Sequence, residues 1–141
     1  MQRGEIVADD QTTVLAISTR QTGGIYERSY PLGSLFAAPI GYYDPTNGRT
    51  GLEAYRNGVL AGSPPQQSSI TDQLEGKRTS GDEVVTTLDA HAQQVAYSAL
   101  AGRAGAVVAI VPSTGAIRVF ADSPTYDPNE VKHYRAFHRC V

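Results

Sequence analysis

The C-terminal part of the sequence contains a strong signal for a β-hairpin. Two short apolar runs, Ala106–Val111 and Ala116–Ala121, flank the tetrapeptide PSTG, which ends at Gly115. Proline fixes φ for a tight turn, and the glycine can adopt the left-handed conformation that closes it. The pattern therefore predicts two antiparallel strands within Gly105–Ala121.

The segments before this hairpin predict further short strands. Apolar stretches at Glu5–Val7 and Val14–Ser18 surround polar residues that favour a turn, which indicates a first hairpin. The 14 glycines and 8 prolines among 141 residues imply many turns between short elements. More strands are expected at Ile25–Tyr30, Ser68–Asp72 and Glu83–Leu88, and the last two are expected to pair as a hairpin.

A short helix is predicted at Gly51–Leu60. Thr50 and Glu53 have the spacing of a capping box, in which the threonine hydroxyl accepts an N-terminal backbone N–H and the glutamate reaches back to another. Glu53 also has a second interpretation. If the helix end packs against Arg3 or Arg49, the carboxylate would form a buried ion pair instead.

A longer helix is predicted at Asp89–Leu100, where Asp89 is a suitable N-cap and Gly102 follows the last helical residue. Good helix formers fill its interior. Its expected apolar stripe consists of Ala92, Val95, Ala96, Ala99 and Leu100. Together these segments predict an α+β fold: a β-rich pedestal of short hairpins with two helices, followed by the hairpin at Gly105–Ala121.

Composition argues against a nucleic-acid partner, an internal disulfide and a membrane-spanning helix. The 12 lysines and arginines against 14 acidic residues give a formal charge of −2, which argues against binding nucleic acid. Cys140 is the only cysteine, so an internal disulfide is excluded. No run approaches the roughly 20 apolar residues of a membrane helix, and no signal sequence follows the first residues. The chain by itself is expected to be soluble.

No catalytic chemistry can be assigned from the residues. The only lysines are Lys77 and Lys132, and no serine stands three positions before either of them. Neither a G-x-S-x-G elbow nor a K-T-G element is present. His133, His138 and Cys140 lie close together in the sequence, but a disordered tail is expected here rather than a metal site. No cofactor is expected.

Several segments, in order, resemble motifs of class B penicillin-binding proteins. The hairpin and the SPTYDPN sequence that ends at Asn129 are similar to the start of the transpeptidase domain of these proteins. Earlier matches are Arg3–Ile6 (R-G-x-I), Tyr30–Tyr42 (Y-P-x-G…G-Y), Gly51–Glu53 (G-L-E) and Gly81–Asp89 followed by Gln93 or Gln94. The order is collinear over positions 3 to 129, and the spacing is closest to the actinobacterial penicillin-binding protein A type.

The resemblance implies three regions. Residues 1–104 would be the pedestal, or dimerisation domain, residues 105–129 the first hairpin of an incomplete transpeptidase domain, and residues 130–141 a tail that departs from the family pattern. The chain is therefore expected to be a product that stops before the active site. No catalytic, cofactor-binding or metal-binding residue is expected. The candidates for structural and interaction roles are Arg3, Gly4, Gly41, Thr50, Gly51, Glu53, Asp89, Gly115, Asp127 and Asn129.

The function implied by the resemblance is that of a non-catalytic part of a penicillin-binding peptidoglycan D,D-transpeptidase, which acts in cell-wall synthesis and cell division. The parent protein would lie at the outer face of the cytoplasmic membrane, with an N-terminal anchor. Its pedestal would position the catalytic domain and contact a membrane-embedded glycan polymerase or other proteins of the division or elongation machinery.

Two alternatives remain: a free-standing protein-interaction module acting through the apolar Leu35–Tyr43 segment, or a complete enzyme with an unrecognised site. The 106–121 hairpin is also expected to associate with other copies of the chain. Both faces of its first strand are apolar, and a strand of this kind normally has a cover on each side.

Overall fold

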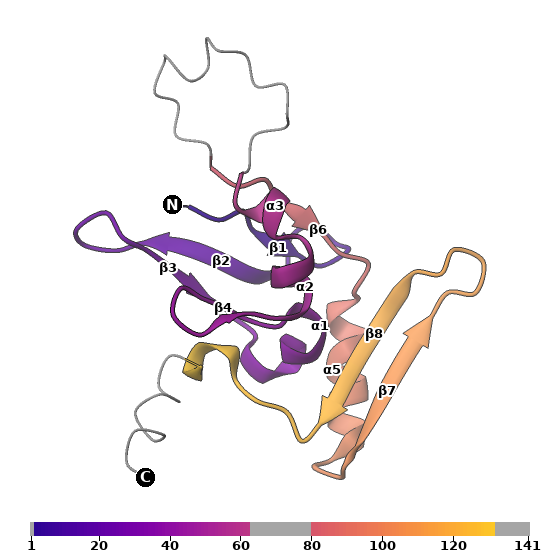
Figure 1. Cartoon of the computed structure of the whole chain (residues 1–141). Helices are drawn as coiled ribbons and strands as arrows, with labels where there is room; N and C mark the ends of the chain where they lie inside the picture. Colours follow the sequence, from indigo (N-terminus) through magenta and orange to yellow (C-terminus); the bar gives the residue numbers. More distant parts are fainter. Residues whose placement is uncertain (1, 63–79, 132–141) are drawn as a thin grey trace, which may run out of the picture.

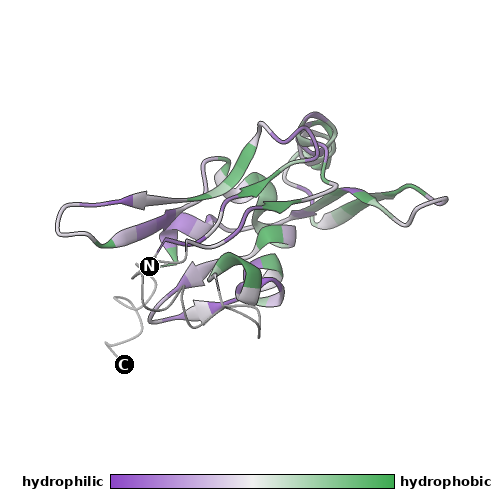
Figure 2. Cartoon of the chain, turned by 90° about the horizontal axis from the view of Figure 1, so that it is seen from above, coloured by the Kyte–Doolittle hydropathy of each residue, from purple (hydrophilic) through white to green (hydrophobic). Residues whose placement is uncertain are grey.

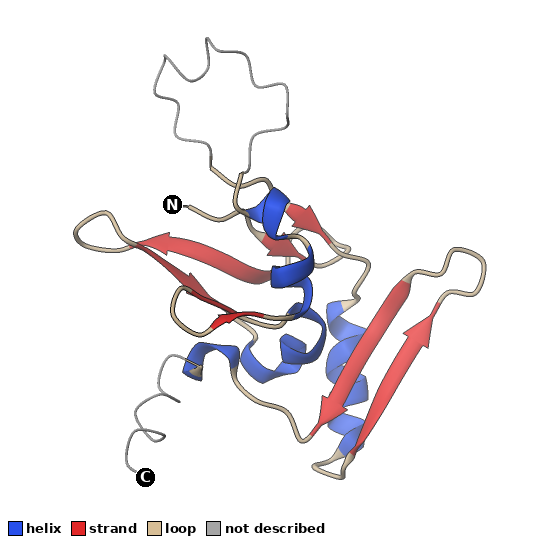
Figure 3. Ribbon diagram, in the orientation of Figure 1, coloured by secondary structure: helices blue, strands red, loops and turns tan. Residues whose placement is uncertain are grey.

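The computed structural model describes residues 2–62 and 80–131, and it confirms the α+β class (Figure 3). The strands are β1 (Ile6–Val7), β2 (Val14–Arg20), β3 (Tyr26–Ser29), β4 (Tyr43–Asp44), β5 (Gly48–Arg49), β6 (Val84–Val85), β7 (Gly105–Ile110) and β8 (Ile117–Ser123). The helices are α1 (Ala37–Ile40), α2 (Gly51–Tyr55), α3 (Asn57–Leu60) and α5 (Ala90–Leu100), with the 3₁₀ helices η1 (Gly33–Phe36) and η2 (Pro128–Glu130).

The first hairpin is confirmed. β1 and β2 are antiparallel neighbours in a four-stranded sheet of order β3-β2-β1-β6. The turn between them is held by Asp10, whose carboxylate accepts the backbone N–H groups of Thr12 and Thr13 at 2.9 and 2.8 Å. A further hydrogen bond from the Thr13 hydroxyl is the largest cause that lowers the pKa of Asp10 to about 2.

The second expected hairpin is only partly testable, because Ser68–Asp72 lies outside the described residues. The Glu83–Leu88 strand is shorter than predicted: β6 has two residues, and it pairs in parallel with β1. The segments that lead into β1 and β6 meet with their backbones in contact, since a Cβ at Gly4 would lie 1.8 Å from the Asp82 carbonyl oxygen. This close approach is the structural reason for glycine at position 4.

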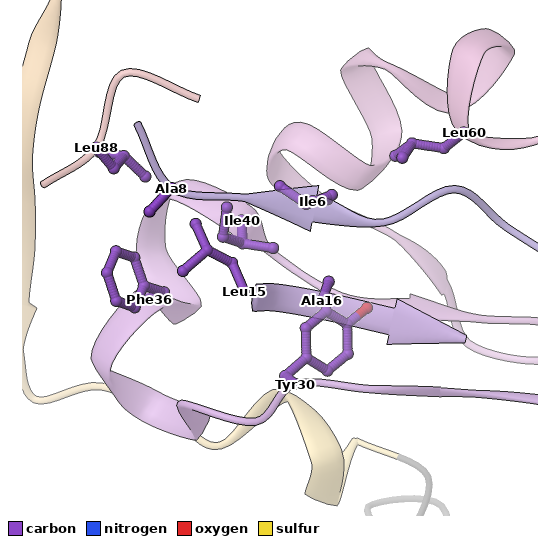
Figure 4. Close-up of a cluster of buried hydrophobic side chains, with 9 residues drawn as sticks. All are labelled: Ile6, Ala8, Leu15, Ala16, Tyr30, Phe36, Ile40, Leu60 and Leu88. Atoms are coloured by element: carbon purple, nitrogen blue, oxygen red, sulfur yellow. The ribbon is translucent and has the colours of Figure 1, made fainter. Parts of the chain in front are cut away.

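The core lies between the four-stranded sheet and the segment η1–α1 (Figure 4). Phe36 and Ile40 reach from this segment toward Leu15 of β2 and Ile6 of β1. Burial of each such side chain contributes about 1.5–3 kcal/mol. The full cluster consists of Ile6, Ala8, Leu15, Ala16, Tyr30, Phe36, Ile40, Leu60 and Leu88.

The helix predicted at Gly51–Leu60 is two short helices, α2 and α3, and the break between them falls at Arg56. The residues that follow the break, Asn57 and Gly58, both have low helix propensity. Leu60 is fully buried, whereas Val59 beside it is 40% exposed.

Helix α5 is confirmed with its predicted cap, since the Asp89 carboxylate accepts the Ala92 N–H at 2.9 Å. Its predicted apolar stripe is partly wrong. Val95 is 55% exposed and Ala99 is exposed, while the fully buried residue of this helix is Gln93. The side of the helix that bears Gln93 faces β8, because the Gln93 amide forms hydrogen bonds with the backbone of Phe120 in that strand.

The C-terminal hairpin is confirmed as β7 and β8, with Val108 opposite Phe120. Gly115 has φ of +73°, and its N–H donates to the Val111 carbonyl at 2.8 Å, which closes the predicted turn. Figure 1 shows the hairpin beyond α5, apart from the pedestal sheet, and the chain after β8 returning to the pedestal at η2.

Hydrophobic segments concentrate in the pedestal interior and along the β7–β8 hairpin (Figure 2). Within residues 2–62 and 80–131, no helix has the length and apolar character needed to cross a membrane.

Candidate functional site

A buried charge cluster joins the N-terminal segment to β3 and α2. Glu53 is fully buried, and its Oε2 accepts hydrogen bonds from Nη2 and Nε of Arg3 at 2.7 and 3.2 Å. Its Oε1 accepts from Nε of Arg28 at 2.6 Å and from the Tyr30 hydroxyl at 3.3 Å. One carboxylate therefore lies between two buried guanidinium groups.

Each arginine also binds the backbone or a neighbouring element. Arg3 donates from Nη1 to Oδ1 of Asn57 at 2.9 Å and stacks 4.0 Å from the ring centroid of Tyr43. Arg28 donates from Nη1 to the Gly4 carbonyl at 2.7 Å. The cluster consequently ties together β3, β4, α2, α3 and the segment before β1.

The predicted capping box at Thr50 is wrong. Thr50 has the extended backbone of an N-cap, but its side chain caps no N–H of α2; its Oγ1 accepts the Tyr42 N–H at 3.3 Å. The structure has the alternative, a buried ion pair between Glu53 and Arg3. Arg49, the other arginine considered, donates to Asn57 instead.

Sequence reasoning missed Arg28, although the strand pattern held a signal. Tyr26 and Arg28 of β3 alternate with Tyr30, which follows the end of the strand, and the last two are buried. An arginine at an inward position of a half-buried strand needs a carboxylate partner, because an unpaired buried charge is costly.

Tyr30→Phe is expected to reduce the loss of stability above about pH 10. Burial of the phenol and, second, the negative charge of Glu53 raise the pKa of Tyr30 above its ordinary value near 10. The native phenol therefore keeps its proton where the unfolded chain has lost it. This contribution to stability is complete below about pH 10 and is lost as pH rises toward the native pKa, at about 1.4 kcal/mol per pH unit.

Denaturant unfolding from about pH 9 to pH 11 measures this effect. Tyr55→Phe, at a side chain that is 80% exposed, is the matched control. Parallel pH curves for the unmodified chain and Tyr30→Phe would contradict the expectation.

Two glycines from the list of structural candidates allow the C-terminal end of α1 to contact the N-terminal end of α2. Gly41 and Gly51 have φ of +72° and +56°. A Cβ at Gly41 would lie 2.3 Å from the Thr50 carbonyl oxygen, and one at Gly51 would lie 2.8 Å from the Gly41 nitrogen. Any side chain at either position would force these backbones apart.

Asn129 attaches the end of the described chain to the pedestal. Its Nδ2 donates to the Tyr30 carbonyl and its Oδ1 accepts the Tyr30 N–H, both at 2.9 Å, so the amide pairs with this backbone as a neighbouring strand would. Asp127 orients it by accepting from the Asn129 backbone N–H and from Nδ2, at 2.9 and 2.8 Å.

Gln93 makes the corresponding attachment between α5, η1 and β8. Its Nε2 donates to the carbonyls of Leu35 and Phe120 at 2.8 and 2.9 Å, and its Oε1 accepts the Phe120 N–H at 2.9 Å. The edge of β8 that faces away from β7 is thereby hydrogen-bonded. The motif pattern left Gln93 and Gln94 as alternatives; Gln94 is exposed and bonds Ser98 of its own helix.

An apolar groove of about 400 Å³ runs between α2–α3, β6 and β8. Its exposed side chains include Val59, Val85, Ile117 and Phe120, which are 38–48% accessible. The Leu35–Tyr43 segment is less suited to binding a partner, since Phe36, Ala37 and Ile40 are buried in the core.

A metal site receives no support from the part of the chain that the structure describes, which contains no group of three or more His, Cys, Asp or Glu side chains able to hold an ion. His133, His138 and Cys140 lie outside the described residues.

Comparison with protein families matches residues 3–84 to the family described as the penicillin binding protein A dimerisation domain. The chain is 35% identical over 135 residues to the peptidoglycan D,D-transpeptidase PbpA of Mycolicibacterium smegmatis, which covers 91% of this chain and 27% of that protein. It is also 35% identical over 136 residues to PbpA of Mycobacterium tuberculosis strain H37Rv, with the same coverage. The chain thus spans about a quarter of the length of these curated relatives.

The fold is similar to solved structures of the same kind. The crystal structure of penicillin-binding protein A from Mycobacterium tuberculosis superposes with a TM-score of 0.84 at 31% identity, covering 98% of this chain and 34% of that one. A D,D-transpeptidase domain of a peptidoglycan glycosyltransferase from Eggerthella lenta gives a TM-score of 0.78 at 36% identity, covering 98% and 29%.

Proposed function

Because the chain belongs to the family of penicillin-binding protein A dimerisation domains, we propose that it is the pedestal and first transpeptidase hairpin of a peptidoglycan D,D-transpeptidase. In this role it is non-catalytic. It holds the catalytic domain of its parent protein at the outer face of the cytoplasmic membrane, and it contacts a glycan polymerase or another protein of the division or elongation machinery.

The observation that carries this proposal is the set of hydrogen bonds that connects the pedestal to the hairpin and to the chain after it. Gln93 bonds both η1 of the pedestal and β8 of the hairpin, and Asn129 returns the chain to Tyr30. A pedestal can set the position of a catalytic domain only if direct contacts fix the orientation of one relative to the other. These partly buried hydrogen bonds, two of them made by the fully buried Gln93 side chain, supply such a connection.

The lack of catalytic motifs supports a positioning role. A penicillin-binding transpeptidase requires a serine activated by a lysine one helical turn away. The sequence contains no S-x-x-K, S-x-N or K-T-G. In this proposal residues 1–104 are the pedestal and residues 105–129 are the beginning of the catalytic domain, on the order of the motifs along the chain.

A chimera tests the proposal directly. Residues 3–129 would replace the matched segment of the Mycolicibacterium smegmatis PbpA, and the purified chimera would be treated with fluorescent penicillin. We expect covalent labelling of the chimera and none of the present chain. A folded chimera that takes no label would contradict the positioning role, and a stoichiometric, heat-stable label on the chain itself would contradict the non-catalytic role.

Self-association of the hairpin is a separate expectation. β7 pairs only with β8 among the described strands, and Val108 and Ile110 are 49% and 55% exposed. An exposed apolar edge strand without charges is prone to pair with another copy. We expect concentration-dependent dimers in sedimentation velocity, reduced by Val108→Lys but not by Val85→Lys, at a similarly exposed valine outside the hairpin. A monomer at high micromolar concentration would contradict this.

A further inference from the structure

A second cavity, of about 480 Å³, is lined by the two arginines of the charge cluster and by a third arginine. Arg3 and Arg28 contribute from the buried cluster, and Arg49 contributes from β5. Ser18, Tyr43 and Asn57 add polar groups to the same lining. The cavity is a recess open to solvent in which several hydrogen-bond donors converge.

The charge of this cavity is not balanced by the described residues. None of its described lining residues is acidic, and Glu53, which accepts from both Arg3 and Arg28, supplies one negative charge against three positive charges. The carboxylate of Asp44, on the neighbouring β4, accepts the backbone N–H groups of Thr46 and Asn47 in its own turn. An excess of two positive charges remains.

Arg28 has an unused donor. Its side chain is 3% exposed, and its Nη2 is buried without a hydrogen-bond partner among the described residues. A buried donor left unpaired costs about 1–3 kcal/mol, more when it carries charge. Arg49 is exposed, and its one hydrogen bond to a described residue is to Oδ1 of Asn57 at 3.3 Å, so most of its guanidinium donors are also unused.

We propose that this cavity binds an oxyanion of the phosphate class, held between Arg28 and Arg49. The planar fork of a guanidinium group matches two oxygens of a phosphate, and two such groups with an amide nearby can surround one anion. Binding lowers the excess positive charge and links β3 to β5. The site is independent of the role proposed above. The anion is either free phosphate or the phosphate of a lipid headgroup, which presents the same oxygens.

The experiment titrates the full chain with inorganic phosphate at constant ionic strength, with chloride as the reference anion, and follows backbone amide shifts and the thermal midpoint. We expect saturable shifts around β3 and β5 and a rise in the midpoint. Arg49→Gln should weaken binding at least tenfold, while Arg103→Gln, at an exposed arginine at the end of α5, should leave it unchanged. Equal responses of these two variants would overturn the site.

A second variant and a second probe complete the test. Arg28→Lys keeps a positive charge near Glu53 but removes Nη2, and it should bind phosphate more weakly if it folds; unchanged phosphate affinity would overturn the role of Arg28.

Co-sedimentation with phosphatidylglycerol vesicles, compared with phosphatidylcholine vesicles, separates the two sources of the anion. Vesicle binding that inorganic phosphate displaces assigns the headgroup, and saturable phosphate binding without vesicle binding assigns the free anion. The absence of both would overturn the proposal.

Discussion

Glu53→Ala is expected to lower the free energy of unfolding by about 3–5 kcal/mol, because removal of one partner leaves a buried charge without compensation. Here the single carboxylate serves two guanidinium groups, Arg3 and Arg28, which are 6% and 5% exposed. A loss of this size is a large part of the roughly 5–15 kcal/mol that stabilises a typical domain. A capping role alone would predict only about 0.5–2 kcal/mol.

Chemical denaturation of Glu53→Ala, with Glu83→Gln as the control variant, measures this loss of stability. Glu83→Gln removes a carboxylate from an exposed position and should change stability by less than about 0.5 kcal/mol. Thr50→Ala tests the capping box separately and should also have a small effect, since the threonine side chain caps no N–H of α2. If Glu53→Ala cost no more than Thr50→Ala, the buried cluster would not stabilise the pedestal.

Gln93→Leu is expected to detach the β7–β8 hairpin from the pedestal and to cost roughly 2–4 kcal/mol, since a backbone group left without a partner costs about 1–3 kcal/mol when fully buried and less when partly exposed. Three partly buried groups lose their partner: the carbonyl of Leu35 and both the carbonyl and the N–H of Phe120. Leucine fills a similar volume but offers no hydrogen bond.

Hydrogen exchange locates this effect. The Phe120 amide, which donates to Gln93 in the native structure, should exchange much faster in Gln93→Leu, while amides of β1 and β2 keep more of their protection. Gln94→Leu is the matched control, because the adjacent glutamine is exposed and its hydrogen bond among the described residues is to Ser98 of the same helix. Unchanged exchange at Phe120 would show that other contacts hold the hairpin in place.

Elements whose signals lie within a few residues could be predicted from the sequence. The β7–β8 turn depends on a proline and on Gly115 three positions later, and the N-cap of α5 depends on Asp89 and the N–H of Ala92. The Asp10 turn acts over two or three residues. Dihedral preferences and short-range hydrogen bonds decide such features wherever the segment lies in the fold.

Prediction from neighbouring residues was wrong for Glu53, which has both a possible partner nearby in the sequence and partners far away in it. Glu53 matches a capping box with Thr50, but the structure pairs it with Arg3, 50 residues away, and Arg28, 25 residues away. A buried carboxylate gains more from two charged donors than from one backbone N–H. The periodicity of α5 likewise favoured Val95 as an inward residue, whereas Gln93 faces β8.

The α+β class, the positions of most of the testable strands and the family could be predicted from local sequence patterns and the order of the motifs. The parallel pairing of β6 with β1, the partners of Glu53 and the role of Gln93 depend on the three-dimensional packing of the chain. The physical reason is the range of the interactions. Turns and caps are formed by neighbours in the chain, whereas ion pairs and strand neighbours depend on which distant segments burial brings together.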